Sequence, residues 1–244
     1  MKQDNPVALI TGSARGIGRE IALAFAREGF RLGLNFIQSD AKAAEVERQA
    51  TQLGGQPLLL KADVGDSVQV QGMVKSLVKK WGRIDVLINN AGTTRDRTIL
   101  KMSDGEWNDV LRTNLTGAFW CLRECAKQMV EQKDGAIINI ASLVALRGSI
   151  GNANYAASKA GLLALTKSAA KEFGRFNVRV NAVLPGFHLT DMAREVWAKY
   201  EEKIRSEHVL ERLTDIRELA QFIVFLARQK SVSGQVFNFE SRVV

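Results

Sequence analysis

The sequence alternates short, continuously apolar runs with longer amphipathic runs, and this alternation limits its fold more than any other feature. Continuously apolar runs predict strands that are buried on both faces of a sheet. We expect strands at residues 7–11, 31–36, 57–62, 84–89, 136–142, 178–183 and 235–239. We expect helices at residues 17–28, 40–53, 67–81, 103–131, 153–174 and 215–227. Together with right-handed crossovers, this order predicts an α/β fold: a single Rossmann-type, doubly wound parallel sheet of about seven strands with helices on both faces.

Length and composition fit one domain over residues 1–244. A hydrophobic content of 46% with 25% charged residues is usual for a soluble globular protein, and we find no internal repeat or linker. The first residues do not form a signal peptide, and no stretch is long enough to span a membrane. We therefore expect a cytoplasmic protein that does not bind membranes.

The cysteines and histidines do not predict a metal site or a disulfide. Cys121 and Cys125 lie in an expected helix and fit buried thiols better than a disulfide or a metal motif. His188 and His208 are far apart in the sequence and have few other ligands nearby. We therefore expect no metal.

The net charge of +8, from 34 basic and 26 acidic residues, predicts attraction to anions. Three partners fit this charge: a cofactor phosphate, nucleic acid, or an acidic protein. The basic residues are dispersed and no aromatic platform accompanies them, so nucleic acid is the weakest of the three.

Three glycines follow the first expected strand and open the first expected helix. They are Gly12, Gly16 and Gly18, in the spacing G-x-x-x-G-x-G rather than the common G-x-G-x-x-G. Glycines at this place permit a tight turn and a close approach of the backbone to a ligand, and the helix N-terminus presents N–H groups to a phosphate. The pattern therefore predicts a dinucleotide-binding turn.

The end of the second expected strand bears on the choice of cofactor. An acidic residue there would bind the ribose hydroxyls of NAD, but Asn35 occupies the tip and no carboxylate occurs before Asp40. Arg15 projects from the glycine turn, where it either meets a phosphate or is a solvated surface charge. Together these residues favour NADP(H) over NAD.

With these motifs in place, the sequence resembles the short-chain dehydrogenase/reductase family. The resemblance runs from about residue 6 to 239 and rests on motifs in the expected order: "TGSARGIG" (11–18), "NNAG" (89–92), Asn114, Ser142, the Tyr155/Lys159 pair, and "PG" (185–186) followed by Thr190. Within the family, "NNAGTTRD" (89–96), "EWNDVLRTNL" (106–115), "NANYAASKAGL" (152–162) and "PGFHLTDM" (185–192) are most similar to the 3-oxoacyl-[acyl-carrier-protein] reductases.

The resemblance implies a catalytic set of Asn114, Ser142, Tyr155 and Lys159. Tyr155 would give the proton to the substrate oxygen and Ser142 would hold that oxygen. On a helix, residues four apart share a face, so we expect Lys159 to lie beneath the Tyr155 hydroxyl and to lower its pKa. By resemblance, Lys159 also bonds the nicotinamide ribose, and Asn114 carries a water of a proton relay.

The resemblance also implies the cofactor contacts. Asp63 would accept the adenine amino group and Thr190 would bond the carboxamide. Asn89 would line the ribose pocket, bridge strands, or do both. The full expected set is Gly12, Ser13, Arg15, Gly16, Ile17, Gly18, Asn35, Asp63, Val64, Asn90, Ala91, Gly92, Tyr155, Lys159, Pro185, Gly186, His188 and Thr190.

The sequence departs from the family at three places. His188 stands where related reductases usually have an aliphatic residue, the segment before the last strand is short, and Glu240-Ser241-Arg242 replaces an Asp-Gly-Gly turn. The altered C-terminus puts the usual subunit interface in doubt. Residues 187–212 form either a mobile substrate lid, as in the family, or a fixed pair of surface helices.

Three functions compete. The first is NADPH-dependent reduction of a 3-oxoacyl thioester of acyl carrier protein or coenzyme A. An acidic carrier protein would then dock on a basic patch, or the patch is only a solvated face; its residues are Lys127, Lys133, Arg175 and Arg179. The second is reduction of another small ketone, or oxidation of a secondary alcohol. The third is an inactive cofactor-binding subunit of a hetero-oligomer. Pairing of helices 103–131 and 153–174 with a second copy predicts a homodimer or homotetramer.

Overall fold

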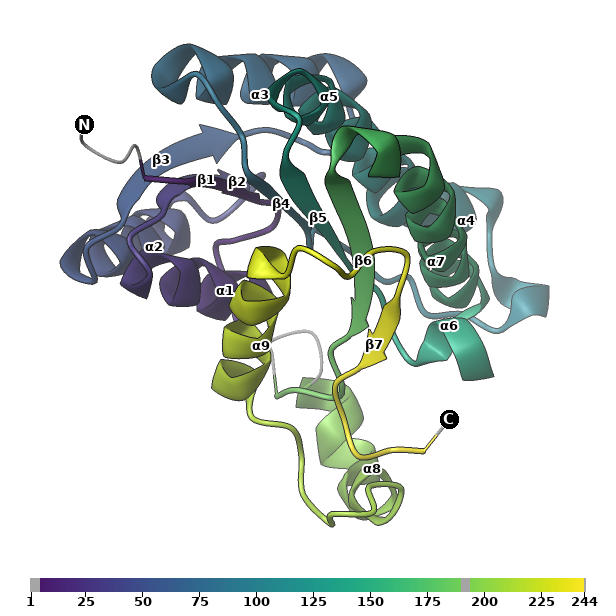
Figure 1. Ribbon diagram of the computed structural model, residues 1–244. Coiled ribbons are helices and arrows are strands. Elements are labelled where there is room, and N and C mark those ends of the chain that lie inside the picture. The colour runs from purple at the N-terminus through teal and green to yellow at the C-terminus, as the bar shows by residue number, and fades with distance from the viewer. Residues whose placement is uncertain (1–4, 190–193, 244) are drawn as a thin grey trace.

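The computed structural model describes residues 5–189 and 194–243, and it contains one parallel sheet between two layers of helices (Figure 1). The described strands are β1 (Val7–Ile10), β2 (Arg31–Phe36), β3 (Gln56–Lys61), β4 (Val86–Asn89), β5 (Gly135–Ile140), β6 (Val178–Leu184) and β7 (Val236–Asn238). Their order across the sheet is β3-β2-β1-β4-β5-β6-β7, and every neighbouring pair is parallel. The predicted doubly wound α/β fold is therefore confirmed.

The described α-helices are α1 (Gly16–Arg27), α2 (Asp40–Gln52), α3 (Ser67–Trp81), α4 (Asp104–Leu111), α5 (Gly117–Gln132), α6 (Val144–Arg147), α7 (Ala153–Phe173), α8 (Arg194–Ser206) and α9 (Ile216–Arg228). Most of the long helices cover one or the other face of the sheet, whereas α8 lies beyond its edge (Figure 1). Helices α1, α2 and α9 cover one face over a core that includes Ile10, Phe25 and Leu32. Helices α3, α5 and α7 cover the other face, over a core that includes Leu9, Leu77 and Ile137.

The predicted helix at 103–131 is interrupted. A five-residue π-helical segment, Arg112–Thr116, separates α4 from α5. The cause is a set of side-chain contacts: Asn114 within this segment is buried and bonds Thr93 and Ser158 from two other parts of the chain. π-segments inside α-helices occur mostly at functional sites, where they aim a side chain that an α-helix would direct elsewhere.

The sheet order reverses between β1 and β4, and this reversal determines where a ligand would bind. Strand β1 pairs with β2 on one side and with β4 on the other. In open α/β sheets the crevice outside the carboxyl ends of such strands binds the ligand. The 187–212 region continues from the carboxyl end of β6 and includes α8, which lies near the C-terminal tail (Figure 1).

Candidate active site

The glycine turn lies at the carboxyl end of β1, and its backbone leaves no room for side chains. Gly12 and Gly16 adopt positive φ angles of 64° and 55°. A Cβ on Gly18 would lie 2.3 Å from the carbonyl oxygen of Gly12 and 2.4 Å from Nδ2 of Asn90. The turn is therefore packed directly against the first turn of α1, whose N-terminal N–H groups suit a phosphate.

Two side chains join this turn to the end of β4. The Asn90 amide donates to the carbonyls of Thr11 and Gly12 at 2.9 and 3.1 Å. The Thr11 hydroxyl accepts from the main-chain N–H groups of Asn90 and Ala91, both at 3.0 Å. Asn90, Ala91 and the turn thus form one hydrogen-bonded unit at the place where the sheet order reverses. Thr11 was not among the predicted contacts, although it opens the "TGSARGIG" motif.

Asn35 has a different place from the one predicted. It lies beneath the turn with only 2% of its surface exposed, and its amide donates to the carbonyls of Leu60 and Ala62. Its side-chain oxygen accepts from the Gly12 N–H, and its carbonyl accepts from the Ser13 N–H and hydroxyl. Asn35 therefore supports the turn from the sheet side, and the prediction that it contacts the cofactor is wrong because its polar groups are turned inward. Ser13 is likewise buried.

A pocket of about 550 Å³ opens beside the turn. Arg15, Gly16 and Leu189 line it, together with Arg19 and Lys42 from α1 and α2. Glu20 and Glu45 also line the pocket, and Glu20 pairs with Arg19, so the three cationic side chains leave a small excess of positive charge that suits a phosphate-bearing ligand. Arg19 and Lys42 were missed in the sequence; the signal for Arg19 is its position four residues after Arg15, on the same face of the turn and helix.

The predicted adenine contact, Asp63, is joined to the segment that carries Asn114. Its carboxylate accepts from Arg112 at 2.9 Å and from the Gly65 N–H at 2.8 Å, and Arg112 also donates to the Gly65 carbonyl. Val64 is buried beside it, with its carbonyl against Gly117 at the start of α5. The Asp63–Arg112 pair therefore connects the predicted adenine wall with the π-helical segment.

Ser142 and Tyr155 meet at the carboxyl end of β5. Ser142 follows β5, and Tyr155 stands in the first turn of α7. Burial raises the pKa of Tyr155, a hydrogen bond from Ser142 lowers it, and the negative charge of Asp96 raises it, so the net direction is upward. The two hydroxyls are therefore neighbours.

Lys159 lies one helical turn after Tyr155, but its ammonium group points to the sheet. Its Nζ donates to the Ile140 carbonyl at 2.7 Å and lies 5.7 Å from the centre of the Tyr155 ring. Burial lowers the pKa of Lys159 to about 8. The prediction that Lys159 lowers the pKa of Tyr155 is therefore wrong for this arrangement, in which burial of the phenol outweighs the other effects.

Asn114 is brought to the same place by the π-helical segment. Its side-chain oxygen accepts from the Thr93 N–H at 2.8 Å, and its amide donates to the Thr93 carbonyl and the Ser158 hydroxyl at 3.0 and 3.2 Å. A Cβ on Gly92 would lie 3.3 Å from the Asn114 side-chain oxygen and 3.8 Å from Nζ of Lys159. Gly92, Asn114 and Lys159 are thus neighbours.

The segment after β6 closes the other side of the site. Gly186 has a φ of 86°, and the His188 ring donates from Nε2 to the Pro185 carbonyl at 2.7 Å. Burial lowers the pKa of His188, although the Pro185 carbonyl and the charge of Glu240 raise it. Thr190, the predicted carboxamide contact, lies outside the described residues.

Asn89 has a structural place, one of its two predicted alternatives. It is buried, and its amide donates to the carbonyl of Ala118 and the side-chain oxygen of Asn139, which in turn donates to Thr166. This chain of bonds joins β4 to β5 and to α7.

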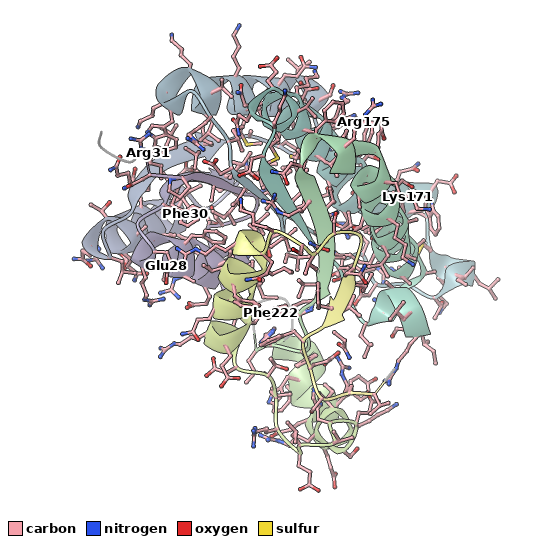
Figure 2. All side chains as sticks on the ribbon, viewed as in Figure 1. Glu28, Phe30, Arg31, Lys171, Arg175 and Phe222 are labelled. Atoms are coloured by element: carbon pink, nitrogen blue, oxygen red, sulfur yellow. The ribbon has the colours of Figure 1, made fainter. Side chains whose placement is uncertain are left out.

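The predicted docking patch does not form one surface near the site. Arg179 is buried and pairs with Asp134 at 2.8 Å, and Lys127 pairs with Glu124 at 2.6 Å. Lys133 and Arg175 are exposed, but they precede β5 and β6, so they lie at the amino edge of the sheet, opposite Ser142 and Tyr155. Figure 2 shows Arg175 and Lys171 at that end of α7.

Two further observations concern the chain as far as it is described. Cys121 and Cys125 are free and buried, and burial raises the pKa of Cys121 to about 12. In residues 5–189 and 194–243, no cluster of three or more His, Cys, Asp or Glu side chains could hold a metal ion. No helix in these ranges is long and apolar enough to cross a membrane.

Comparison with known proteins gives consistent matches along the chain. The family model described as short chain dehydrogenase matches residues 6–201. The 3-oxoacyl-[acyl-carrier-protein] reductase FabG of Staphylococcus aureus is 41% identical over 233 residues, which cover 95% of each chain. The 3-oxoacyl-[acyl-carrier-protein] reductase of Synechocystis is 41% identical over 98% of this chain and 96% of its own. A variant of actinorhodin polyketide ketoreductase, solved with NADPH, superposes with a TM-score of 0.92 at 31% identity, covering 98% of this chain and 97% of that one.

Proposed function

This chain belongs to the short-chain dehydrogenase family of nicotinamide-dependent oxidoreductases, and we propose that it reduces a 3-oxoacyl thioester to the 3-hydroxyacyl form with NADPH. The observation that carries the proposal is the meeting of Ser142 and Tyr155 at the same sheet edge as the glycine turn, with Lys159 one helical turn away. The names of the Staphylococcus and Synechocystis relatives support the thioester as substrate.

The glycine turn and the pocket beside it fit a dinucleotide. The missing Cβ of Gly18 allows the turn to lie on α1, and the basic side chains of Arg15, Arg19 and Lys42 suit a cofactor that carries an extra phosphate. The carboxylate nearest the end of β2, Asp40, pairs with Lys61 at 2.9 Å. These residues favour NADP(H) over NAD.

When bound, the nicotinamide supplies the hydride. Of the predicted contacts, Asp63 and Val64 would hold the adenine, Asn90, Ala91, Gly92 and Lys159 the nicotinamide ribose, and Pro185, Gly186, His188 and Thr190 the carboxamide. Gly12, Ser13, Gly16, Ile17 and Gly18 would form the phosphate turn, in which Ser13 is buried and bonds the Asn35 carbonyl through its N–H and hydroxyl groups.

The protein's own part is to hold the carbonyl and to deliver a proton. Ser142 donates a hydrogen bond to the substrate oxygen while Tyr155 transfers its proton to that oxygen. The raised pKa of Tyr155 keeps the phenol protonated at neutral pH, which suits reduction. The Asn114 amide is used by Thr93 and Ser158, so a relay water at this residue rests on its main-chain carbonyl.

An acidic carrier protein is the proposed donor of the substrate. Two exposed basic side chains, Lys101 and Arg147, lie on segments that follow β4 and β5 and therefore stand at the edge that carries the site. Docking there predicts that activity on the carrier-bound substrate falls steeply with salt, whereas activity on the coenzyme A thioester falls less. Equal salt dependence for the two substrates would argue against docking.

Two further proposals follow from the family. Residues 187–212, including α8, act as a cover over the substrate within a single domain of residues 1–244. Helices α5 and α7 pair with a second copy of the chain to give a homodimer or homotetramer, and Phe119 on α5 is 39% exposed and available for such a contact.

The test is a substrate screen with purified protein, in which the decrease of NADPH or NADH absorbance is followed with acetoacetyl-coenzyme A and several small ketones. We expect turnover of the thioester with a preference for NADPH. If the protein turns over only other ketones, the thioester is not its substrate and a small ketone takes its place in the proposal. No turnover with any of them, together with normal NADPH binding, would favour an inactive subunit of a hetero-oligomer.

A further inference from the structure

Glu240, part of the C-terminal sequence that replaces the usual glycine turn, is a fully buried carboxylate. None of its side-chain surface is exposed. Arg242 binds it in two places, from Nε to Oε2 at 2.7 Å and from Nη2 to Oε1 at 2.9 Å. A buried carboxylate requires compensation of this kind, because desolvation of an unpaired charge is very unfavourable.

His208, two residues beyond α8, is the second group that faces this carboxylate. Its side chain is completely buried, and Nε2 lies 3.4 Å from Oε2 of Glu240. Its Nδ1 donates to the Ile204 carbonyl at 2.7 Å, and a carbonyl can only accept, so Nδ1 carries a proton. The ring therefore faces the carboxylate through Nε2, a buried atom that has no hydrogen-bond partner among the described residues.

The carboxylate also lies directly under the segment that follows β6. A Cβ on Gly186 would come within 2.9 Å of the Glu240 Cβ and 2.9 Å of the Thr214 hydroxyl. The charge of Glu240 reaches His188 and raises its pKa. On the other side, the Val209 N–H donates to the Ser241 carbonyl at 3.2 Å. Glu240 and Ser241 thus lie between the segment that follows β6 and the residues just beyond α8.

We propose that Glu240 is a positioning residue: its carboxylate lies between His208, beyond the end of α8, and the Pro185–His188 segment, and so holds that segment in the arrangement that completes the site. The Phe187 and Trp197 rings, 5.9 Å apart, give a further contact between these two parts. The functional consequence rests on the proposed oxidoreductase activity, whereas the tie itself does not.

The charged groups around Glu240 determine the effect of removing its carboxylate. Arg242 and His208 face the carboxylate, His188 lies within its field, and Glu207 lies 3.7 Å from Arg242 on the outer side. Replacement by an uncharged amide of the same shape leaves the largely buried Arg242 guanidinium without this counter-charge. The segment that carries His208 can relieve this by moving toward solvent, whereas the sheet cannot.

The test compares Glu240→Gln with wild type by hydrogen–deuterium exchange and by NADPH titration. We expect exchange in peptides from 194–212 to rise about tenfold while β4 and β5 keep wild-type rates. If the reductase activity is confirmed, the KM for NADPH should rise about tenfold with a smaller change in kcat, and Glu240→Asp should restore part of it. Glu201→Gln, which breaks the exposed Glu201–Arg205 pair on α8, is the matched control and should change neither measurement.

Several results would overturn the proposal. Wild-type exchange in 194–212 for Glu240→Gln would show that the carboxylate ties nothing, and equal increases in all peptides would show a general structural role. If Glu240→Gln does not fold, His208→Asn tests the same tie from the other side and should raise exchange in 194–212 alone. Absence of reductase activity in the wild type would refute the proposed function but would leave the exchange test intact.

Discussion

Lys159 gives the sharpest test of the site, because its burial implies a stability cost that depends on pH. Burial lowers its pKa from 10.5 to about 8. Each pKa unit corresponds to about 1.4 kcal/mol, so protonated Lys159 costs the folded state about 3 kcal/mol. The cost is complete below pH 8, where the side chain is charged in both states. This cost decreases between pH 8 and pH 10.5, where only the unfolded chain keeps the proton. Above pH 10.5 the side chain is neutral in both states and the cost is absent.

Lys159→Met removes this cost and also removes the hydrogen bond to the Ile140 carbonyl. The lost hydrogen bond, worth about 1 kcal/mol, contributes equally at every pH. The desolvation cost of Lys159, in contrast, depends on pH: between pH 7 and pH 9.5 it falls by about 2 kcal/mol. The free energy of unfolding of the variant minus that of the wild type should therefore be about 2 kcal/mol larger at pH 7 than at pH 9.5.

The measurement is equilibrium unfolding in urea at the two pH values, followed by tryptophan fluorescence. Lys75→Met, a replacement of an exposed lysine on α3, is the control and should show no pH-dependent difference. An equal difference between Lys159→Met and wild type at both pH values would refute the reasoning, because it would mean that Lys159 keeps an ordinary pKa in the folded protein.

Two other substitutions test the same edge of the sheet. Tyr155→Phe should lower turnover about a thousandfold while the unfolding curve and the NADPH dissociation constant stay near wild type, and near-normal turnover would remove Tyr155 from the mechanism. Gly18→Ala should weaken NADPH binding at least about a hundredfold in a fluorescence titration, because the new methyl group would lie 2.3 Å from the Gly12 carbonyl. Gly72→Ala, at a helical position with open space, should bind NADPH normally and unfold at a slightly higher urea concentration.

The sheet and most helices could be predicted because buried parallel strands leave a direct signal in the sequence. The helix at 67–81 and the strand at 31–36 have the predicted bounds. The π-helical break at Arg112–Thr116 could not be predicted, because its cause is the contact of Asn114 with Thr93 and Ser158, which are distant in sequence. The pattern of apolar residues continues through the break without a proline.

The candidate site could also be predicted only in part from the sequence. Motifs predicted which side chains gather at the carboxyl edge, since loops that follow parallel strands meet there. Side-chain direction was harder: Asn35 turns inward to bond neighbouring strands, and Arg179 is buried against Asp134. The burial of Glu240 was also not predictable, because its partners Arg242 and His208 come together only when the tail reaches the end of α8.

The two buried charges at this edge are compensated differently, and the difference bears on why Lys159 is present. Glu240 has the Arg242 guanidinium bound to both of its oxygens, whereas the described hydrogen bond of the Lys159 ammonium is to a strand carbonyl. A methionine could fill the same space among the small residues of α7 without the desolvation cost. Close packing therefore explains the alanines around Lys159 but not the lysine itself. An ammonium group held beside Gly92, Asn114 and the Tyr155 ring is what the proposed proton transfer and ribose binding require, and the pH dependence of Lys159→Met measures what its burial costs the fold.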